Sequence, residues 1–416
     1  MRFAGDFHIH SKYARATSKD MNLENLDVWA KIKGIGVISC GDFTHPAWFK
    51  ELQEKLEPSE PGLFKLRGVQ SATRFILTTE ISCIYSKGGA VRRVHLILFA
   101  PSLEAVAKIN AALGKIGNLK ADGRPILGLD AKEAVRICLE ADPECMVVPA
   151  HAWTPWFAVF GSKSGFNSLR ECFEEYTPYI YAIETGLSSD PLMNWQLSQL
   201  DAITLLSNSD SHSLAKIGRE ANFFDTELSY RGIADAMKKK DAKKFLFTAE
   251  FFPEEGKYHY DGHRACGVVL KPAESKKYNN ICLKCAKPLT IGVLNRVAEL
   301  ADRPEGVKPA NAIPYKSMIA LEEIIADALG MRVAAKKVRA EYENIIKHFG
   351  NEFSVLLDVN VKDIERVASL KIAEGISRVR EGKVHIAPGY DGEYGKIEIF
   401  PKRESKHSLS QPTLFS

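Results

Sequence analysis

Side chains able to bind a metal ion recur through the first half of the chain, each at or just after an apolar run. The first run ends in "DFHIH", where His8 and His10 are two residues apart. Residues i and i+2 of a strand point to the same face, so both imidazoles can reach one object. Imidazole and carboxylate ligands without thiolate favour zinc, manganese or iron. The remaining candidate ligands, in chain order, are Asp42, His45, Glu80, His95, His151, Asp210 and His212.

These nine candidate ligands are too many for one ion. They suit two or three divalent ions (zinc, manganese or magnesium), with Glu80 as the carboxylate that bridges them. A single histidine is more often a satisfied core residue than a ligand. Here, however, six of the eleven histidines fall at the ends of apolar runs, and chance explains that poorly.

Clustered ions have a specific chemistry. They acidify a bound water and clamp the attacking and leaving oxygens of an in-line displacement at phosphorus. The sequence has no GxxxxGK[ST] loop, no GxGxxG after a strand and no GxSxG elbow, so no motif of these kinds offers a competing site. The residues alone therefore predict hydrolysis of a phosphate ester.

Seven β-rich runs must position these groups: residues 3–9, 37–40, 75–81, 94–99, 146–149, 181–184 and 204–208. Stretches with apolar residues at helical spacing, such as "LEAVAKINAALGKI", lie between them. This alternation predicts an α/β fold with a parallel sheet covered by helices, as a closed barrel or a doubly wound sheet. In a β/α barrel the strand carboxyl ends converge on one face, which would gather the ligands. We expect this catalytic barrel to span residues 1–250.

A second metal motif follows the barrel, in a segment of loop-like composition. It reads His263-x2-Cys266, then 15 residues, then Cys282-x2-Cys285. Two short-spaced pairs across a loop predict one tetrahedral structural zinc, with His259 as an alternative to His263. We therefore expect a small zinc-binding module over residues 251–306. The other five cysteines fall mostly in apolar runs, typical of reduced thiols in a reducing compartment.

The C-terminal part changes character twice. Residues 307–400 follow a mainly helical pattern, and residues 401–416 form a polar tail that ends in "QPTLFS". Gln411, Leu414 and Phe415 match the bacterial sliding-clamp motif QxxLF. Large apolar residues in a polar tail usually need a partner, so we expect the tail to bind a sliding clamp.

Length and composition set outer limits. The chain has 416 residues, 45% of them apolar, and a net charge of +4, which is too small to indicate nucleic-acid binding by itself. No stretch approaches the apolar length of a membrane span, and the N-terminus lacks the layout of a signal peptide. We expect a cytoplasmic protein, and nothing demands more than a monomer.

The ordered set of HxH, Asp and His, Glu, two further His and a final DxH resembles the PHP (polymerase and histidinol phosphatase) superfamily over about residues 1–225. The resemblance implies a distorted seven-stranded β/α barrel that holds up to three metal ions. The chain departs from the family pattern in two places. "SKYARATSKD" lacks the further histidine that many PHP proteins have there, and "GDFTHP" replaces the more usual Asp-His pair.

Over its full length the chain resembles the endonuclease Q family. The resemblance rests on "DFHIHSKYARATSKDM", "GDFTHP", "HAWTPWFAVFGSKSGFNSL", "YHYDGHR", "CLKCAKPLTIGVLNRVAELADRPEG" and "PGYDGEYGKIEIF". It implies a DNA repair endonuclease, acting on double- or single-stranded DNA, that cuts 5′ to abasic sites and to deaminated bases (uracil, hypoxanthine, xanthine). Metal-activated water would attack phosphorus and leave a 3′-hydroxyl and a 5′-phosphate. Asp210 and His212 would bind the catalytic ions, and Glu80 would bridge them.

Reading a damaged base requires taking it out of the stack and into a pocket with a stacking surface. The first candidate is the loop after His151, with aromatic Trp153, Trp156, Phe157 and Phe160. In the same loop the backbone N–H groups of residues 161–165 (Gly161, Ser162, Lys163, Ser164 and Gly165) would cradle a phosphate. The second candidate is the group Tyr258, His259 and Tyr260. The alternatives are an ordinary hydrophobic lid and simple packing between domains.

Three other functions compete with the lesion endonuclease. A PHP phosphatase for a small phosphomonoester would explain the barrel but leave the zinc module and the tail without a role. A PHP exonuclease would release mononucleotides instead of making one internal nick. A non-catalytic DNA-binding or clamp-tethered scaffold should have lost ligands, whereas this chain retains nearly all of them.

Overall fold

A mixed sheet of eleven strands forms the centre of the N-terminal part in the computed structural model, which describes residues 1–401. The strands run in the order β15-β12-β11-β1-β2-β5-β4-β3, and β6 pairs with both β5 and β8. The longer strands are β1 (Arg2–Asp6), β2 (Ile35–Ser39), β5 (Arg74–Lys87), β6 (Ala90–Ala100), β8 (Met146–Pro149), β11 (Ala221–Asp225) and β12 (Phe245–Glu250). The short ones are β3 (Leu56–Pro58), β4 (Phe64–Leu66), β7 (Ile126–Leu127) and β15 (Tyr315–Ser317).

Each of the seven predicted strands is present, but the all-parallel arrangement is wrong. The pairs β5–β6, β6–β8, β1–β11 and β11–β12 are antiparallel. The physical reason is clearest at β5 and β6, which continue into one another through Gly88 and Gly89, both with positive φ. A two-residue hairpin loop can join only antiparallel strands, and glycine supplies the backbone that such a turn needs.

The strands within residues 1–401 also do not form the closed barrel that was predicted as one alternative. The strands β9 (Ala182–Glu184) and β10 (Thr204–Leu206) form a two-stranded sheet of their own. Side chains span the gap beside β1. The Asn222 amide donates to the carbonyls of Gly5 and Ser207, and the Phe7 N–H donates to the Asn208 side chain. The carboxyl ends of β1 and β10 therefore still lie together.

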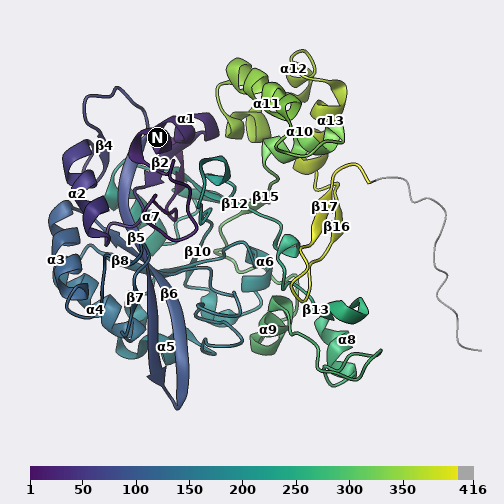
Figure 1. Cartoon of the computed structure of the whole chain (residues 1–416), viewed down its shortest axis with the longest axis horizontal. Coiled ribbons are helices and arrows are strands. Elements are labelled where there is room, and N and C mark those ends of the chain that lie inside the picture. Colours follow the sequence, from purple (N-terminus) through teal and green to yellow (C-terminus); the bar gives the residue numbers. More distant parts are fainter. Residues whose placement is uncertain (402–416) are drawn as a thin grey trace, which may run out of the picture.

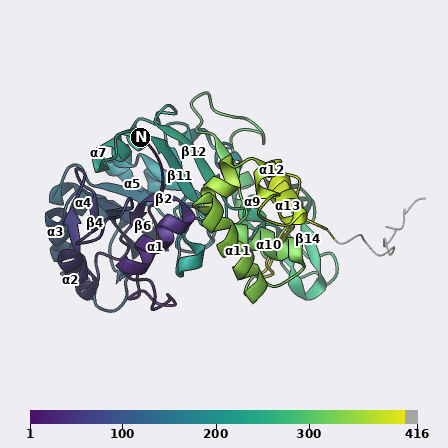
Figure 2. The same cartoon turned by 90° about the horizontal axis from the view of Figure 1, so that it is seen from above.

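Helices cover the outer side of the sheet (Figures 1 and 2). They include α1 (Leu23–Lys33), α2 (Pro46–Lys55), α3 (Leu103–Leu113), α4 (Ala131–Ala141) and α7 (Tyr230–Lys238), with the shorter α5 (Leu169–Phe173) and α6 (Pro191–Asn194). Asn22, Ser102, Asp130 and Ser229 begin four of them, each accepting a hydrogen bond from a first-turn N–H. Such caps satisfy donors that have no partner inside a helix, which fixes where each helix begins.

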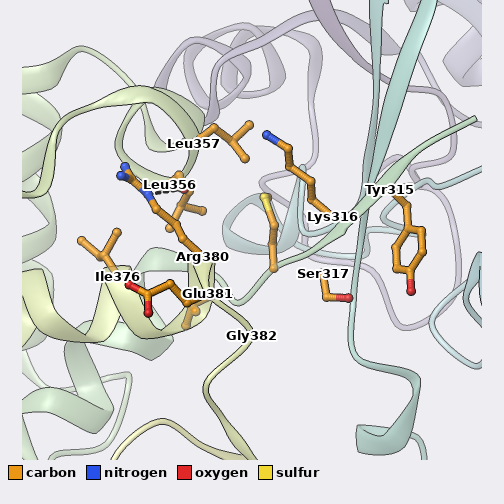
Figure 3. Close-up of a pocket in the computed structure, with 11 residues that line it drawn as sticks. Tyr315, Lys316, Ser317, Leu356, Leu357, Ile376, Arg380, Glu381 and Gly382 are labelled. Atoms are coloured by element: carbon orange, nitrogen blue, oxygen red, sulfur yellow. Dashed lines mark hydrogen bonds between the residues drawn. The ribbon is translucent and has the colours of Figure 1, made fainter. Parts of the chain in front are cut away.

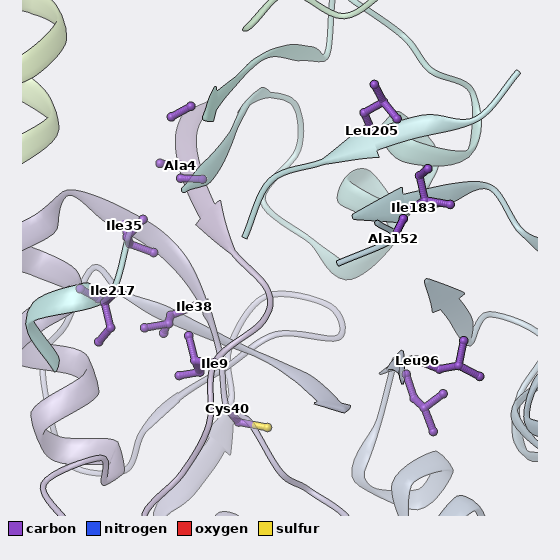
Figure 4. Packing of buried hydrophobic residues seen from close by; sticks show 14 of the residues in the cluster. Ala4, Ile9, Ile35, Ile38, Cys40, Leu96, Ala152, Ile183, Leu205 and Ile217 are labelled. Atoms are coloured by element: carbon purple, nitrogen blue, oxygen red, sulfur yellow. The ribbon is translucent and has the colours of Figure 1, made fainter. Parts of the chain in front are cut away.

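Apolar side chains from strands far apart in the sequence fill one continuous core. Figure 4 shows Ile35 and Ile38 of β2, Leu96 of β6, Ile183 of β9 and Leu205 of β10 in this cluster. All five are buried. Packing across the break in strand pairing thus holds β9 and β10 against the rest of the sheet.

Two further parts follow the N-terminal sheet and its helices along the chain. One contains β13 (Asp261–His263), β14 (Val268–Leu270), α8 (Pro272–Lys277) and α9 (Val293–Leu300), and the other contains α10 (Leu321–Leu329), α11 (Lys336–Phe349), α12 (Val361–Ile364) and α13 (Leu370–Arg380). The hairpin β16 (His385–Ala387) and β17 (Lys396–Glu398) runs between them in Figure 1. Its loop approaches Glu254 so closely that a Cβ on Gly395 would lie 1.9 Å from the Glu254 carbonyl oxygen. Glycine is therefore required there.

The helical part contacts the N-terminal body at several places. Lys33 of α1 pairs with Glu352 at 2.6 Å in a buried contact, and Phe223 of β11 packs on Phe353 with ring centroids 5.0 Å apart. Farther along, β15 and α13 enclose a cavity of about 450 Å³ (Figure 3). The Arg380 guanidinium beside it donates to the carbonyls of Val355, Leu356 and Val359, so it holds the preceding π-helical turn in place. No helix in residues 1–401 combines the length and the apolar character needed to cross a membrane.

Candidate metal centre and lesion pocket

Two groups of metal-binding side chains share one residue, and they combine residues that follow strands with Glu80 and His95 from within β5 and β6. His8, His10, Glu80 and Asp210 form the first group, and Glu80, His95 and His151 form the second. Within each group, the ligand atoms all lie within 4.8 Å of one another. The structure thus places in two groups six of the nine residues that the sequence predicts as ligands.

Glu80 lies between two pairs of histidines and offers one oxygen to each pair. Its Oε1 is 2.7 Å from His95 Nδ1 and 3.1 Å from His151 Nε2. Its Oε2 is 3.2 Å from His10 Nε2 and 3.5 Å from His8 Nε2. A carboxylate with one oxygen on each side is the arrangement needed to bridge two cations.

Buried atoms without partners test whether cations fit this centre. Nε2 of His8, Nε2 of His10 and Oδ1 of Asp210 are buried, and none of them forms a hydrogen bond of normal geometry within residues 1–401. Buried polar atoms are rarely left in this state, because each one costs free energy. A divalent cation would satisfy all three, so the residues fit the ions predicted from the sequence.

Two carboxylates stand behind the first histidine pair and orient it. His10 Nδ1 donates to Asp42 Oδ1 at 2.9 Å, and His8 Nδ1 donates to Glu184 at 3.0 Å. Each ring therefore directs its Nε2 into the centre, as carboxylate-backed histidine ligands do. Asp42, which the sequence predicts as a ligand, lies outside both groups, and its carboxylate instead accepts hydrogen bonds from His10 and from the Ser11 N–H. Glu184 also accepts from the Asn208 amide and the His151 N–H.

His45 and His212 lie outside both groups. His45 stacks on Tyr13 at 4.4 Å between ring centroids, so its predicted role as a ligand is not supported by its position. His212 lies closer, with its ring 4.4 Å from that of His10. Its Nδ1 donates to the Asp210 carbonyl, which leaves Nε2 as the ring atom able to bind a cation at the edge of the centre.

The backbone is strained at three strand ends that face the centre. Asp42, His151 and Asp210 have φ of 42°, 28° and 46°, in the left-handed region that residues other than glycine rarely adopt. Such conformations persist only where surrounding contacts hold them, and they concentrate at functional sites. Here they accompany the turns that bring these residues to the centre.

Charge and burial act together on the ionisable groups. Burial lowers the pKa of His95 to about 4, against the attraction of Glu80. Desolvation opposes ionisation of Glu80, but His95, Arg124 and His8 outweigh it and hold the pKa of Glu80 well below its usual range. At neutral pH the centre therefore offers an ionised Glu80 carboxylate and a neutral His95 imidazole, the forms that bind metals. Desolvation opposes the charged forms of His8 and His10, but the carboxylates around them outweigh it and raise the pKa of both rings, so a bound cation would displace their protons.

The cysteine motif comes together beside β13. His263, Cys266, Cys282 and Cys285 each bring a ligand atom to within 4.8 Å of the others, whereas the alternative ligand His259 lies outside this group. Desolvation raises the pKa of Cys282, but the backbone N–H groups of Lys284 and Cys285 outweigh it and lower that pKa to about 6. A thiolate is the form that binds zinc, so the set fits the predicted structural ion.

An aromatic pocket of about 220 Å³ adjoins the metal centre. Trp156 and Tyr258 line it with their rings 6.3 Å apart, and so does His259, whose buried Nδ1 has no hydrogen-bond partner within residues 1–401. Thr154 connects pocket and centre, because it borders the pocket while its Oγ1 lies 3.1 Å from His151 Nδ1. The two separate groups that the sequence suggested as lesion readers thus meet in one place.

The chain is similar in sequence to a known domain family and to two known proteins. The MJ0043 C-terminal domain family matches residues 320–383. The MJ0043 protein of Methanocaldococcus jannaschii is 35% identical over 260 residues, which cover 61% of this chain but only 32% of that protein's length. The uncharacterized protein YqxK of Bacillus subtilis is 30% identical over 407 residues, covering 94% of this chain and 98% of that protein.

Solved structures decide the family. The lesion-specific endonuclease PfuEndoQ of Pyrococcus furiosus has a TM-score of 0.85 and 31% identity, with 98% of each chain covered. Endonuclease Q in complex with a 27-mer duplex substrate, with an abasic lesion at its active site, has a TM-score of 0.84 and 32% identity, with 99% of each chain covered. The chain belongs to the endonuclease Q family.

Part of the predicted lesion reader proves to be core. Trp153 and Phe160 are buried against each other, with ring centroids 4.8 Å apart, and the Trp153 indole N–H donates to Asn194. They cannot stack on a base, so that prediction is wrong. Trp156, 43% exposed, is the tryptophan of this loop that can. Phe157 instead packs on His95, with ring centroids 4.7 Å apart.

Most of the predicted phosphate cradle at residues 161–165 is engaged within its own loop. The N–H groups of Gly161, Lys163 and Gly165 donate to carbonyls within the same loop, and buried Ser164 donates to the Arg93 carbonyl. These donors are therefore not free to bind a phosphate. Ser162 and Lys163 keep exposed side chains. Arg296 of α9 fixes the loop by donating to the Phe160 carbonyl.

Of the remaining predicted residues, one has a structural role and three lie outside the described part of the chain. Tyr260 pairs with Tyr390 across a backbone bridge and stacks on His259, so it joins the zinc-binding segment to the C-terminal hairpin. The clamp-binding candidates Gln411, Leu414 and Phe415 lie outside the described residues. Sequence reasoning missed Glu184 as a supporting carboxylate and Arg124, whose guanidinium reaches Glu80.

Proposed function

We propose that the protein repairs DNA by nicking the phosphodiester 5′ to deaminated bases (uracil, hypoxanthine, xanthine) and to abasic sites. As a member of the endonuclease Q family it is a metal-dependent hydrolase that acts on DNA. One observation carries the proposal. The two ligand groups that share Glu80 lie next to an aromatic pocket, so a lesion nucleotide in the pocket would have its 5′ phosphate near the metal centre.

The side chains of the centre would divide the work as follows. His8, His10, Asp210 and Glu80 would hold one divalent ion, and Glu80, His95 and His151 a second, while His212 marks the edge where a third would bind. Such ions, when bound, lower the pKa of water and neutralise charge on phosphate oxygens. Asp42 and Glu184 keep His10 and His8 in the required tautomer. Zinc, manganese and magnesium all suit this nitrogen and oxygen set.

The pocket would receive the damaged base after it leaves the duplex. Its rings, Trp156 and Tyr258, offer stacking surface, and the unpartnered His259 Nδ1 offers a hydrogen bond to the edge of the base. Taking a base out of the stack costs least for damaged or mispaired bases, which favours lesions over normal pairs. Thr154 would couple the occupied pocket to His151.

The wider interactions follow from a DNA substrate. The zinc-binding segment, with His263, Cys266, Cys282 and Cys285, would act as a structural module beside the pocket. The tail residues Gln411, Leu414 and Phe415 would tether a monomeric enzyme to a sliding clamp on cytoplasmic, nucleoid-associated DNA. We assign the catalytic part to residues 1–250, the zinc module to 251–306, the helical part to 307–400 and the clamp-binding tail to 401–416.

A substrate panel tests the proposed reaction class. The full chain is incubated with manganese or magnesium and either a duplex carrying one deoxyuridine, deoxyinosine or abasic site, or an undamaged duplex. Histidinol phosphate and p-nitrophenyl phosphate serve as phosphomonoesters. One internal cut in each damaged duplex supports the proposal. Release of mononucleotides would indicate an exonuclease instead. Hydrolysis of the phosphomonoesters alone would indicate a phosphatase.

A further inference from the structure

The loop before β7 lies at the mouth of the metal centre and is held there tightly. Gly123 donates its N–H to the Tyr13 carbonyl and accepts from Thr44 Oγ1 through its own carbonyl. The Arg15 N–H donates to Asp122. A Cβ on Gly123 would lie 2.4 Å from Asp42 Oδ2, so the loop packs directly on the carboxylate that orients His10. The position of the next residue, Arg124, is therefore fixed relative to the centre.

Arg124 directs its guanidinium at the bridging carboxylate. Its Nη1 lies 3.0 Å from Glu80 Oε2, the oxygen that faces the first histidine pair. In the described part of the chain this is the one hydrogen bond the guanidinium makes, and the side chain is 28% exposed. An arginine has five N–H donors, so the other four make no hydrogen bond to the described residues and can donate to a ligand.

We propose that Arg124 binds a non-bridging oxygen of the scissile phosphate. The inference rests on the proposed function. Guanidinium groups match phosphate oxygens in pairs and keep their charge at any pH near neutrality. A phosphate that spans both ligand groups must lie over Glu80, and the open N–H groups of Arg124 lie beside that same carboxylate. The loop thus supplies a positive charge fixed by the fold.

Arg124 moves no proton in this scheme. The reaction adds water across the P–O3′ bond: the water oxygen bonds to phosphorus, the 3′ oxygen leaves and takes one proton, and the second proton is released to solvent. Negative charge builds on the non-bridging oxygens as the water approaches. A donor already aimed at those oxygens stabilises that charge without reorganising.

The competing role is structural, because an arginine beside a buried glutamate can simply neutralise it. Three measurements on metal-loaded full-length protein separate the two roles: metal content, affinity for an abasic duplex, and the single-turnover rate of cutting it. The variants are Arg124→Ala and Arg124→Lys. Arg136→Ala is the matched control, since this exposed arginine of α4 pairs with Glu133 and Glu140 away from the centre.

We expect Arg124→Ala to keep its ions and to bind DNA within about threefold of wild type. Its cutting rate should fall by about 100- to 1,000-fold, as when one donor to a developing charge is removed. Arg124→Lys should recover only part of this loss, because lysine cannot pair with two oxygens. Added guanidinium ion should raise the rate of Arg124→Ala and leave wild type and Arg136→Ala unchanged.

Loss of ions from Arg124→Ala, or an unchanged cutting rate, would overturn the assignment. A wild-type protein that leaves every damaged duplex intact would instead overturn the proposed function. In that case the same variants are compared on bis(p-nitrophenyl) phosphate, a phosphodiester without a base. A loss confined to Arg124→Ala and Arg124→Lys would then still support the phosphate contact, and equal rates would refute it.

Discussion

His10 Nδ1 lies 2.9 Å from Asp42 Oδ1, and this hydrogen bond decides which residue binds metal and which one orients it. With Nδ1 engaged, the ring presents Nε2 to Glu80 and Asp210, each 3.2 Å away. His8 and Glu184 repeat the relationship at 3.0 Å. The centre is therefore built in two layers, in which buried carboxylates set the tautomers of the histidines that face the ions.

Replacing the outer carboxylate should weaken metal binding without removing a ligand. Asp42→Asn keeps the shape of the side chain but loses its charge, and we expect metal affinity to fall about 10- to 100-fold. Calorimetric titration of the metal-free protein with manganese measures this change in affinity. Asp235→Asn, on the exposed face of α7, is the control. Equal affinities for both variants would show that Asp42 does not support His10.

The shared position of Glu80 predicts unequal losses of metal. His95→Ala removes a residue of one ligand group, so it should lower the metal content of the centre by one ion per chain. Glu80→Gln weakens both groups and should lower it by two ions. Plasma mass spectrometry of the dialysed proteins gives the counts, with the zinc of the cysteine site as an internal reference. The loss of one ion in both variants would contradict a bridging carboxylate.

The pocket predicts a difference between lesions. An abasic site carries no base to stack, so Trp156→Ala should leave the cutting of an abasic duplex nearly unchanged. Cutting of a deoxyuridine duplex should fall roughly 5- to 150-fold, since stacking of one base contributes about 1–3 kcal/mol. Single-turnover rates on both duplexes provide the comparison. Tyr179→Ala is the matched control, since that aromatic residue is also 43% exposed. A parallel loss on both substrates would count against a base-stacking role.

Glu250 is a buried acid that accepts a hydrogen bond from Thr185, and it predicts how the stability of the fold changes with pH. Burial raises the pKa of Glu250 to about 8, against hydrogen bonds from Thr248 and Thr185. Between pH 4.5 and 8 the folded chain therefore holds a proton that the unfolded chain has lost. Stability should fall as pH rises through this window, by at most about 1.4 kcal/mol per unit from this group.

Glu250→Gln tests that prediction because the amide carries no charge at any pH. Its apparent melting temperature should fall less than that of wild type between pH 5 and pH 8. Glu140→Gln, an exposed change on α4, should follow wild type. Identical slopes for wild type and Glu250→Gln would mean that Glu250 is ionised in the folded protein.

Much of the site could be predicted from the sequence because most of its ligands directly follow strands, while Glu80 and His95 lie within them. The runs ending near His10 and Asp210 alternate with helical stretches, and carboxyl ends of neighbouring strands meet at one edge. The division of carboxylates into ligands and supports could not be predicted. Asp42 and Asp210 both follow a strand, and only the packing of His10 shows which one stands behind a ring.

The strand directions and the lesion loop show two other limits. The Gly88-Gly89 pair is a sequence signal for a hairpin. The expectation of a parallel sheet did not take it into account, and the structure has an antiparallel turn there. No comparable signal separates Trp153 from Trp156. Both are aromatic and close in sequence, but the loop folds back so that Trp153 reaches Asn194 and Trp156 faces the pocket.

The decisive experiment maps the cut in an end-labelled duplex with a single abasic site, made by metal-loaded wild type and by Asp210→Asn. We expect one product from wild type, with a 3′-hydroxyl immediately 5′ to the lesion, and none when a chelator is present. Asp210→Asn should cut at least about 100-fold more slowly, because it weakens the first ligand group. Cutting at another position, or equal cutting by Asp210→Asn, would contradict this expectation.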